Sequence, residues 1–199
     1  MIDYFKDINF PTEEEIAKAK ETEQKQLRMD RSDQFDRLCP LGFKDTISDR
    51  LDQNAVKLSK DWADGNIEKL NILIGGATGV GKTRLSWLIL KRKFVMYGLR
   101  YNHIGAESFA RRLNNEKHLM DLMCSESILL FDDLGKERDT PTAEAGVFEL
   151  IRERMDRQKP TIYTTNYNPE ALLDRFIKKE TGSAICRRLK ESSLCIAMK

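Results

Sequence analysis

The sequence predicts an α/β fold of three layers, in which helices cover both faces of a five-stranded parallel sheet. From Lys69 onward, short apolar stretches alternate with longer segments of helical periodicity, and this alternation is typical of a parallel sheet. Glycines or polar residues follow several of the apolar stretches directly. The expected strands are residues 70–75, 100–104, 127–132, 160–165 and 193–198. The expected helices of this part are residues 82–97, 106–115, 142–158, 169–179 and 183–191.

The beginning of the chain has a different composition. The stretch "PTEEEIAKAKETEQKQLRMDRSD" consists almost entirely of charged or polar helix formers. Thr12 and Glu15 have the spacing of a capping box, so we expect a helix over residues 12–30. Its apolar stripe is thin, which indicates an exposed helix.

We therefore divide the chain into an arm and a domain. Residues 1–36 are expected to be a short, charged, helical arm, which either docks a partner or remains a solvated tail. Residues 37–199 are expected to form one domain of ordinary size. The first helix of this domain is expected over residues 52–62, before Gly65.

Composition excludes several classes of protein. Of the 199 residues, 40% are hydrophobic and 33% are charged, and the net charge of +2 argues against a highly basic nucleic-acid coat. Neither a signal peptide nor an apolar run of the ~20 residues needed to span a membrane is visible. Four scattered cysteines show no zinc-ligand spacing and suit a reducing cytosol. We expect a cytoplasmic protein without a membrane partner.

A glycine-rich loop follows the first expected strand. Residues 76–83, "GATGVGKT", fit the pattern G-x-x-x-x-G-K-[ST] of a phosphate-binding loop. The glycines allow successive N–H groups to face one concavity, and the helix that follows adds its dipole. Lys82 is expected to reach the β- and γ-phosphates, and the Thr83 hydroxyl to ligate Mg²⁺. The expected nucleotide contacts are Gly76, Ala77, Thr78, Gly79, Val80, Gly81, Lys82, Thr83 and Arg84. The alternative is a purely structural glycine turn.

Two aspartates follow the third expected strand, in "SILLFDDLGKE". Ligands of open parallel sheets bind at the edge where the strands end, so Asp132 is placed to hold the Mg²⁺ that Thr83 also contacts. Asp133 is placed to polarise an attacking water as general base. The alternative is that these residues are ordinary loop carboxylates with ion-pair partners.

A polar residue also follows the next strand. Asn166 ends "PTIYTTN" and is expected to reach between the γ-phosphate and the attacking water. The alternative is a turn-forming asparagine before Asn168 and Pro169. The succession of loop strand, plain strand, Asp-Asp strand and Asn strand is typical of the hydrolytic branch of phosphate-loop NTPases.

Together these pieces resemble the AAA+ ATPases, and among them the bacterial and phage helicase loaders of the DnaC/DnaI type and their relative IstB. The likeness covers roughly residues 39–199. It is carried by "GATGVGKT", "ILLFDDLGKE", "FELIRERMDRQKPTIYTTNYNPEALLDRF" and "GSAICRRLKES". The resemblance implies ATP and Mg²⁺ as cofactors. It makes Lys82 and Thr83 the Walker A contacts, Asp132 the Walker B ligand, Asp133 the catalytic acid and Asn166 sensor 1.

The resemblance also implies an arginine that reaches the ATP of a neighbouring subunit. Aligning "GSAICRRL" with the family pattern puts this finger on Arg188, with Arg187 as the alternative. Ala184 stands where the family often has a second arginine. No helical lid domain is expected after the last strand, as in loaders of this kind. The family's larger helicase-binding domain is expected to be missing or reduced to residues 1–36.

Single-stranded DNA is a further expected partner. In the segment "ESFARRLNNEKH", Phe109 is a candidate to stack on a base, and Arg111 and Arg112 are candidates to contact phosphates. The alternative is a core phenylalanine with two solvated arginines.

The expected function is that of an ATP-hydrolysing helicase loader in DNA replication. Its expected partners are a replicative helicase of the DnaB type, single-stranded DNA, and further copies of itself at the ATP interface. An IstB-like transposition helper is the first alternative, because it shares the same core. A small-molecule or nucleotide kinase and a nucleotide-gated adaptor without hydrolysis are the others.

Overall fold

The sheet and the helices of the computed structural model follow the expected alternation. The model describes residues 12–137 and 140–199. The strands are β1 (Asn71–Gly76), β2 (Tyr101–Gly105), β3 (Ile128–Asp132), β4 (Thr161–Thr165) and β5 (Ser193–Met198). The α-helices are α1 (Glu13–Leu38), α2 (Leu41–Lys44), α3 (Gln53–Ala63), α4 (Lys82–Tyr97), α5 (Ala106–Leu113), α6 (Leu119–Ser125), α7 (Pro141–Asp156), α8 (Pro169–Asp174) and α9 (Lys179–Ser192). A 3₁₀ turn, η1, spans Ser48–Arg50.

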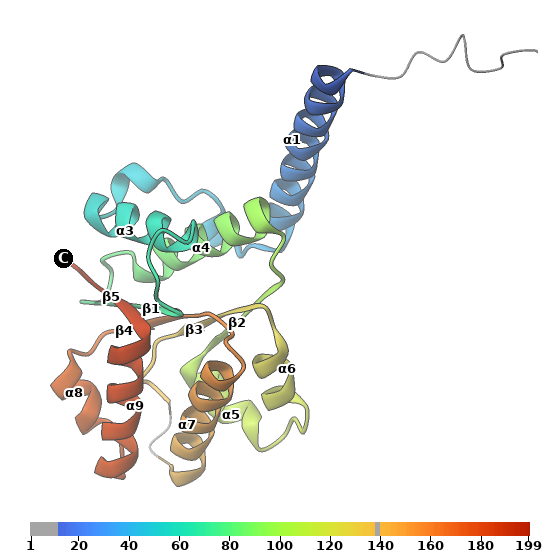
Figure 1. Ribbon diagram of the computed structural model, residues 1–199. Helices are drawn as coiled ribbons and strands as arrows, with labels where there is room; N and C mark the ends of the chain where they lie inside the picture. Colours follow the sequence, from blue (N-terminus) through green and yellow to red (C-terminus); the bar gives the residue numbers. More distant parts are fainter. Residues whose placement is uncertain (1–11, 138–139) are drawn as a thin grey trace, which may run out of the picture.

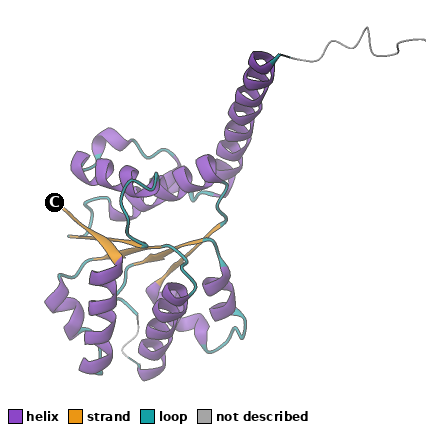
Figure 2. Ribbon diagram, in the orientation of Figure 1, coloured by secondary structure: helices purple, strands orange, loops and turns teal. Residues whose placement is uncertain are grey.

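Within the described residues the sheet has five strands in the order β2-β3-β4-β1-β5, and every pairing is parallel. Each strand lies within one residue of its expected bounds, so the predicted fold class is confirmed. Helices α1, α3 and α4 lie on one face of the sheet, and α5 to α9 lie on the other (Figure 1). Figure 2 shows the strands as the middle layer between the two groups of helices.

Each face of the sheet has its own apolar core. Along β3, Ile128 and Leu130 belong to the core under α3 and α4, whereas Leu129 and Phe131 belong to the core under α5 to α9. All four side chains are fully buried. A strand covered on both faces is apolar at every position rather than at alternate ones, which explains the unbroken "SILLF" run.

Helix α1 is longer than the sequence indicated, and its two halves differ. The capping box of Thr12 and Glu15 forms as predicted. The first half is exposed and extends away from the body (Figure 1). In the second half, Phe35 is 1% exposed and its ring lies edge-on to Trp87, with ring centroids 6.0 Å apart. Asp36 forms an ion pair with Lys91 of α4 at 2.7 Å.

The expected boundary between residues 36 and 37 therefore differs from the observed packing. Phe35 falls on the arm side of that boundary, yet it belongs to the core beside α4. Contact with α4 begins still earlier, where Arg31 donates to the carbonyl oxygen of Val95. The exposed arm accordingly ends near residue 30.

Tertiary contacts decide where α8 ends and α9 begins. The expected helices over 169–179 and 183–191 are observed as α8 and α9, with bounds shifted by several residues. The carboxylate of Glu144 in α7 accepts the N–H groups of Ile177 and Lys178, at 2.6 and 3.2 Å, and so fixes the chain before α9. Gly182 then allows α9 to pack closely against Phe176, because a Cβ at this position would lie only 2.9 Å from the Phe176 side chain.

None of the helices in the described part of the chain combines the length and the apolar character that crossing a membrane requires.

Substitution of Phe35 tests whether the end of α1 belongs to the core. Phe35→Ala should lower the free energy of unfolding by about 3–5 kcal/mol, because it opens a cavity in a closed core. Leu27→Ala, in the exposed half of the same helix, should change it by less than about 0.5 kcal/mol. Urea unfolding of both variants measures the difference. Equal stabilities would show that the end of α1 is not part of the core.

Candidate active site

The loop between β1 and α4 has the conformation that its glycines permit. Gly76 has a φ of +151° and Gly81 a φ of +96°, which side-chain-bearing residues rarely adopt. A Cβ on Gly76 would lie 2.5 Å from the carbonyl oxygen of Met198. Gly81 is the N-cap of α4 and provides no side-chain cap, so the first N–H groups of this helix face the loop. This is the geometry of a helix N-terminus that binds phosphate.

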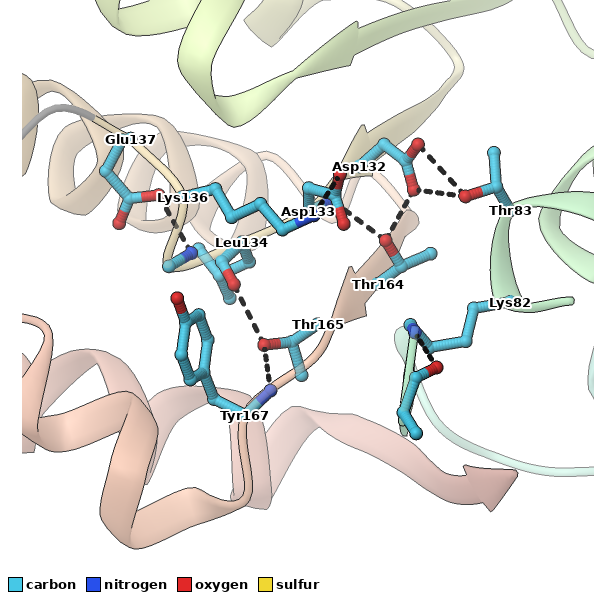
Figure 3. Close-up of polar contacts among 12 residues, drawn as sticks. Lys82, Thr83, Asp132, Asp133, Leu134, Lys136, Glu137, Thr164, Thr165 and Tyr167 are labelled. Carbon is cyan, nitrogen blue, oxygen red and sulfur yellow. Dashed lines mark hydrogen bonds and ion pairs between the residues drawn. The ribbon is translucent and has the colours of Figure 1, made fainter. Parts of the chain in front are cut away.

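Lys82 lies beneath the loop. Its side chain is buried, and its Nζ donates to the carbonyl oxygens of Gly76 at 2.9 Å and Ala77 at 2.8 Å. Burial lowers the pKa of Lys82, while the charges of Asp133 and Asp132 act in the opposite direction. The ammonium group is thus held inside the loop that the predicted phosphates would enter (Figure 3).

Asp132 and Thr83, both predicted to hold Mg²⁺, contact each other at the sheet edge. The Thr83 hydroxyl donates to the Asp132 carboxylate, 3.1 Å from each oxygen. The Thr164 hydroxyl donates to Oδ1 of the same carboxylate (Figure 3). Thr164 was not among the predicted site residues. The only signal for it in the sequence is the pair of threonines that directly precedes Asn166.

Asp133 is held in an unusual backbone conformation. Its φ is +60°, in the left-handed region that a non-glycine residue adopts at an energetic cost. Its N–H donates to the Thr164 hydroxyl at 2.8 Å. Its carboxylate forms an ion pair with Lys136 at 2.9 Å, and both side chains remain about 40% exposed. Strained residues of this kind occur at functional sites. Lys136 was also not predicted.

The turn after Asp133 is tied to the neighbouring strand. The Thr165 hydroxyl donates to the carbonyl oxygen of Leu134 at 2.8 Å and accepts the N–H of Tyr167. The N–H of Gly135 donates to Glu137 at 2.8 Å. The two bonds of Thr165 fix the backbone just before and just after Asn166.

Asn166 follows β4 and is half-buried. Strand β4 pairs with β1 on one side and β3 on the other. Asn166 therefore follows a strand that lies between the strand before the loop and the strand that ends at Asp132. The strand order brings Lys82, Thr83, Asp132, Asp133 and Asn166 to one edge of the sheet.

The residues present fit a magnesium ion. Thr83 and Asp132 offer a hydroxyl and a carboxylate, the hard oxygen ligands that Mg²⁺ prefers. No cluster of three His, Cys, Asp or Glu side chains exists among the described residues. Mg²⁺ commonly uses only one or two carboxylates, with phosphates and water as further ligands, so such a cluster is not required.

A segment before α3 also borders the loop. A Cβ on Gly81 would lie 2.6 Å from a methyl group of Leu51. Arg84, in the first turn of α4, is exposed, and its guanidinium lies 5.9 Å from the centre of the Phe43 ring. Arg84 was among the expected nucleotide contacts, whereas Leu51 and Phe43 were not expected near the loop.

Arg188 lies far along α9, near the edge where β5 begins, and β5 starts at Ser193. The phosphate loop follows the opposite end of β1, which is parallel to β5. The Arg188 guanidinium lies 5.8 Å from the centre of the Phe148 ring, and its Nε is buried without a hydrogen-bond partner. Arg187 is exposed.

The structure corrects the predicted DNA contact at Phe109. This side chain is fully buried, and its ring lies edge-on to Phe131 at 5.5 Å, so it cannot stack on a base. Phe109 is therefore a core phenylalanine, which was the alternative interpretation of the sequence. Arg112 forms an ion pair with Glu116 at 2.7 Å, and Arg111 is exposed.

The strand order and the glycine loop after β1 define a phosphate-loop NTPase fold of the AAA+ type. No protein-family model matches the chain, and no curated protein matches it by sequence. Among solved structures, it is similar to the DnaC helicase loader, with 22% identity, a TM-score of 0.65, and coverage of 74% of this chain and 89% of that chain.

Two further structures are similar. DnaI shares 18% identity with a TM-score of 0.69, over 81% of this chain and 95% of that chain. AMPPCP-bound DnaA from Aquifex aeolicus shares 18% identity with a TM-score of 0.62, over 74% of this chain but 46% of that chain. At these identities the likeness shows the fold, which this chain shares with DnaC and DnaI over nearly their full lengths.

Proposed function

We propose that this chain is an ATP-hydrolysing helicase loader of DNA replication. The observation that carries the ATPase part is the contact between Thr83 and Asp132, with Lys82 beneath the same loop. The match to DnaC, a helicase loader, and to DnaI over nearly their full lengths supports the choice of a loader over other ATPases. An IstB-like transposition helper would have the same site and a different partner.

In this proposal each residue at the sheet edge has one role. Lys82 and the N–H groups of the loop bind the phosphates, and Thr83 and Asp132 hold Mg²⁺. When bound, Mg²⁺ supplies charge neutralisation for the phosphates. Asp133 accepts a proton from the attacking water, and Asn166 orients that water beside the γ-phosphate. Lys82 and Asp133 must exchange their present partners, which are loop carbonyls and Lys136, for nucleotide and water.

Two substitutions separate binding from hydrolysis. Lys82→Ala should abolish ATP binding while the fold persists, because it removes the side-chain ammonium held under the loop. Asp133→Asn should bind ATP with nearly parental affinity and turn over at least about 100-fold more slowly, within the range for general-base catalysis. Calorimetric titration with ATP and a phosphate-release assay measure the two effects. Parental hydrolysis by Asp133→Asn would remove the general-base role, and micromolar binding by Lys82→Ala would contradict the loop assignment.

We further propose that the exposed half of α1 docks the replicative helicase. This half carries Glu13, Glu14 and Glu15 in its first turn, and it buries none of its described side chains before Phe35. Ile16, Leu27 and Met29 are exposed, with 40%, 46% and 55% of their surfaces accessible. A charged helix whose apolar side chains stay exposed within the described part of the chain is suited to binding another protein.

Deletion of residues 1–30 should abolish capture of the organism's replicative helicase and leave the melting temperature and basal ATPase unchanged. The deletion keeps Arg31, Phe35 and Asp36, which contact α4. Pull-down with purified helicase measures capture. A truncated protein that still captures the helicase would place the docking surface in the ATPase body. A full chain that captures a transposase instead would favour the IstB-like function.

We propose that Arg188 contacts the ATP bound by a neighbouring copy of this chain. Arg188 lies toward the edge opposite the loop, which favours contact with the nucleotide of another copy over that of its own chain. Arg188 is half-buried, and its guanidinium lies next to the Phe148 ring. An arginine delivered to a transferring phosphoryl group increases the rate about 10³–10⁵-fold in GTPases.

Arg188→Ala should therefore keep nucleotide affinity, lose most ATPase activity and lose ATP-dependent assembly. Mixing it with Lys82→Ala should restore part of the activity, because one interface then pairs an intact loop with an intact arginine. Arg187→Ala, one residue away and exposed, is the matched control and should keep the parental rate. If confirmed mixed assemblies stay inactive, or if only Arg187→Ala loses activity, Arg188 is not the finger.

We also propose that the chain binds single-stranded DNA and acts in the cytoplasm. With Phe109 in the core, a DNA contact from α5 rests on the exposed Arg111 and on Arg112 beside it. All four cysteines are free thiols, which fits a reducing compartment.

A further inference from the structure

Thr164 connects three consecutive residues at the end of β3 to β4. Its hydroxyl donates to Oδ1 of Asp132 and accepts the N–H of Asp133 at 2.8 Å. Its carbonyl oxygen accepts the N–H of Leu134 at 2.8 Å. The last register pair between β3 and β4 is Phe131 with Tyr163, so Thr164 continues the pairing where the regular ladder stops.

The Thr164 side of these bonds is out of contact with water, whereas Asp132 and Asp133 are half-buried. Thr164 is fully buried, and a buried polar group without a partner is costly, so the hydroxyl is committed to the arrangement seen. The hydroxyl is both a donor and an acceptor: it donates to the carboxylate and accepts a hydrogen bond from the backbone. One hydroxyl therefore fixes the direction of the Asp132 carboxylate and the left-handed backbone of Asp133.

We infer that Thr164 is a positioning residue for both aspartates. The inference rests on the proposed ATPase function and assigns Thr164 a role within that site. Through Asp132, it orients the carboxylate that also contacts Thr83, where the metal is proposed to bind. Through the N–H of Asp133, it sets the direction in which the proposed general base leaves the sheet. Loss of the hydroxyl should impair metal-dependent binding and turnover together.

Strand β4 contains two other buried threonines that serve as comparisons. The hydroxyl of Thr161, at the start of the strand, accepts a hydrogen bond from the buried Arg154 at 2.8 Å. The hydroxyl of Thr165 donates to the carbonyl oxygen of Leu134. Among these three threonines, Thr164 is the one whose hydroxyl contacts a carboxylate. Thr161 is thus a matched control for loss of a buried hydroxyl from the same strand.

The test compares Thr164→Val, Thr164→Ser and Thr161→Val in the full chain. Calorimetry measures AMPPCP affinity with Mg²⁺ and with EDTA, and ATP turnover and melting temperature are measured in parallel. Thr164→Val should keep parental affinity in EDTA but lose about tenfold in the affinity gained from Mg²⁺, and turnover should fall about 10–100-fold, as expected when a group that orients a metal ligand is removed. Thr164→Ser, which keeps the hydroxyl, should restore both.

Thr161→Val should melt earlier than the parent but keep the parental response to Mg²⁺ and the parental turnover. If Thr164→Val behaves like Thr161→Val, Thr164 is only a structural residue, and the proposed function stands because the parent still binds and hydrolyses ATP. If the parent binds AMPPCP in neither condition, the proposed function fails and this inference fails with it. Should Thr164→Val not fold, Thr164→Cys keeps a similar volume with a weakly hydrogen-bonding thiol. Parental Mg²⁺ response and turnover in Thr164→Cys would overturn the inference.

Discussion

The position of β4 between β1 and β3 is the constraint on which the site depends. Residues Ile162 to Thr165 pair with β1, and Thr161 to Tyr163 pair with β3. Because all three strands are parallel, their carboxyl ends lie at one edge. The loop after β1, the aspartates at the end of β3 and the polar residues at the end of β4 are thereby brought together, although Asn166 follows the last loop residue, Thr83, by 83 positions in the sequence.

The two edges of the sheet differ in how firmly they are held. At the edge where β4 begins, Arg154 is 1% exposed and donates to Thr161 and to the carbonyl oxygens of Met123 and Pro160. Burial lowers the pKa of Arg154 to about 10, and its full set of partners compensates for the loss of water. The hydrogen bonds at this edge are therefore shielded from water. At the opposite edge, the ion pair of Asp133 with Lys136 is about 40% exposed.

At the edge where β1, β3 and β4 end, polar side chains contact the loop or one another. Lys82 contacts loop carbonyls, Thr83 contacts the carboxylate that it would share with a metal, and Asp133 contacts Lys136. The ion pair of Asp133 is exposed, so water and salt weaken it. Thr164 is fully buried, so its hydrogen bonds are less accessible to water than this ion pair.

The sequence by itself determined the strands and the glycine loop, because each depends on neighbouring residues. A buried strand needs an unbroken apolar run, and a phosphate loop needs glycines at fixed spacing before a lysine. The boundaries of α1, α8 and α9 were decided by tertiary contacts of Phe35 with Trp87 and of Glu144 with the chain before α9. Phe109 and Thr164 are similar cases, since burial against Phe131 and hydrogen bonding to Asp132 join residues that are distant in the sequence. Local patterns specify backbone conformation and chemistry within one turn or strand, whereas burial and hydrogen-bond partners are set by which strands become neighbours in the sheet.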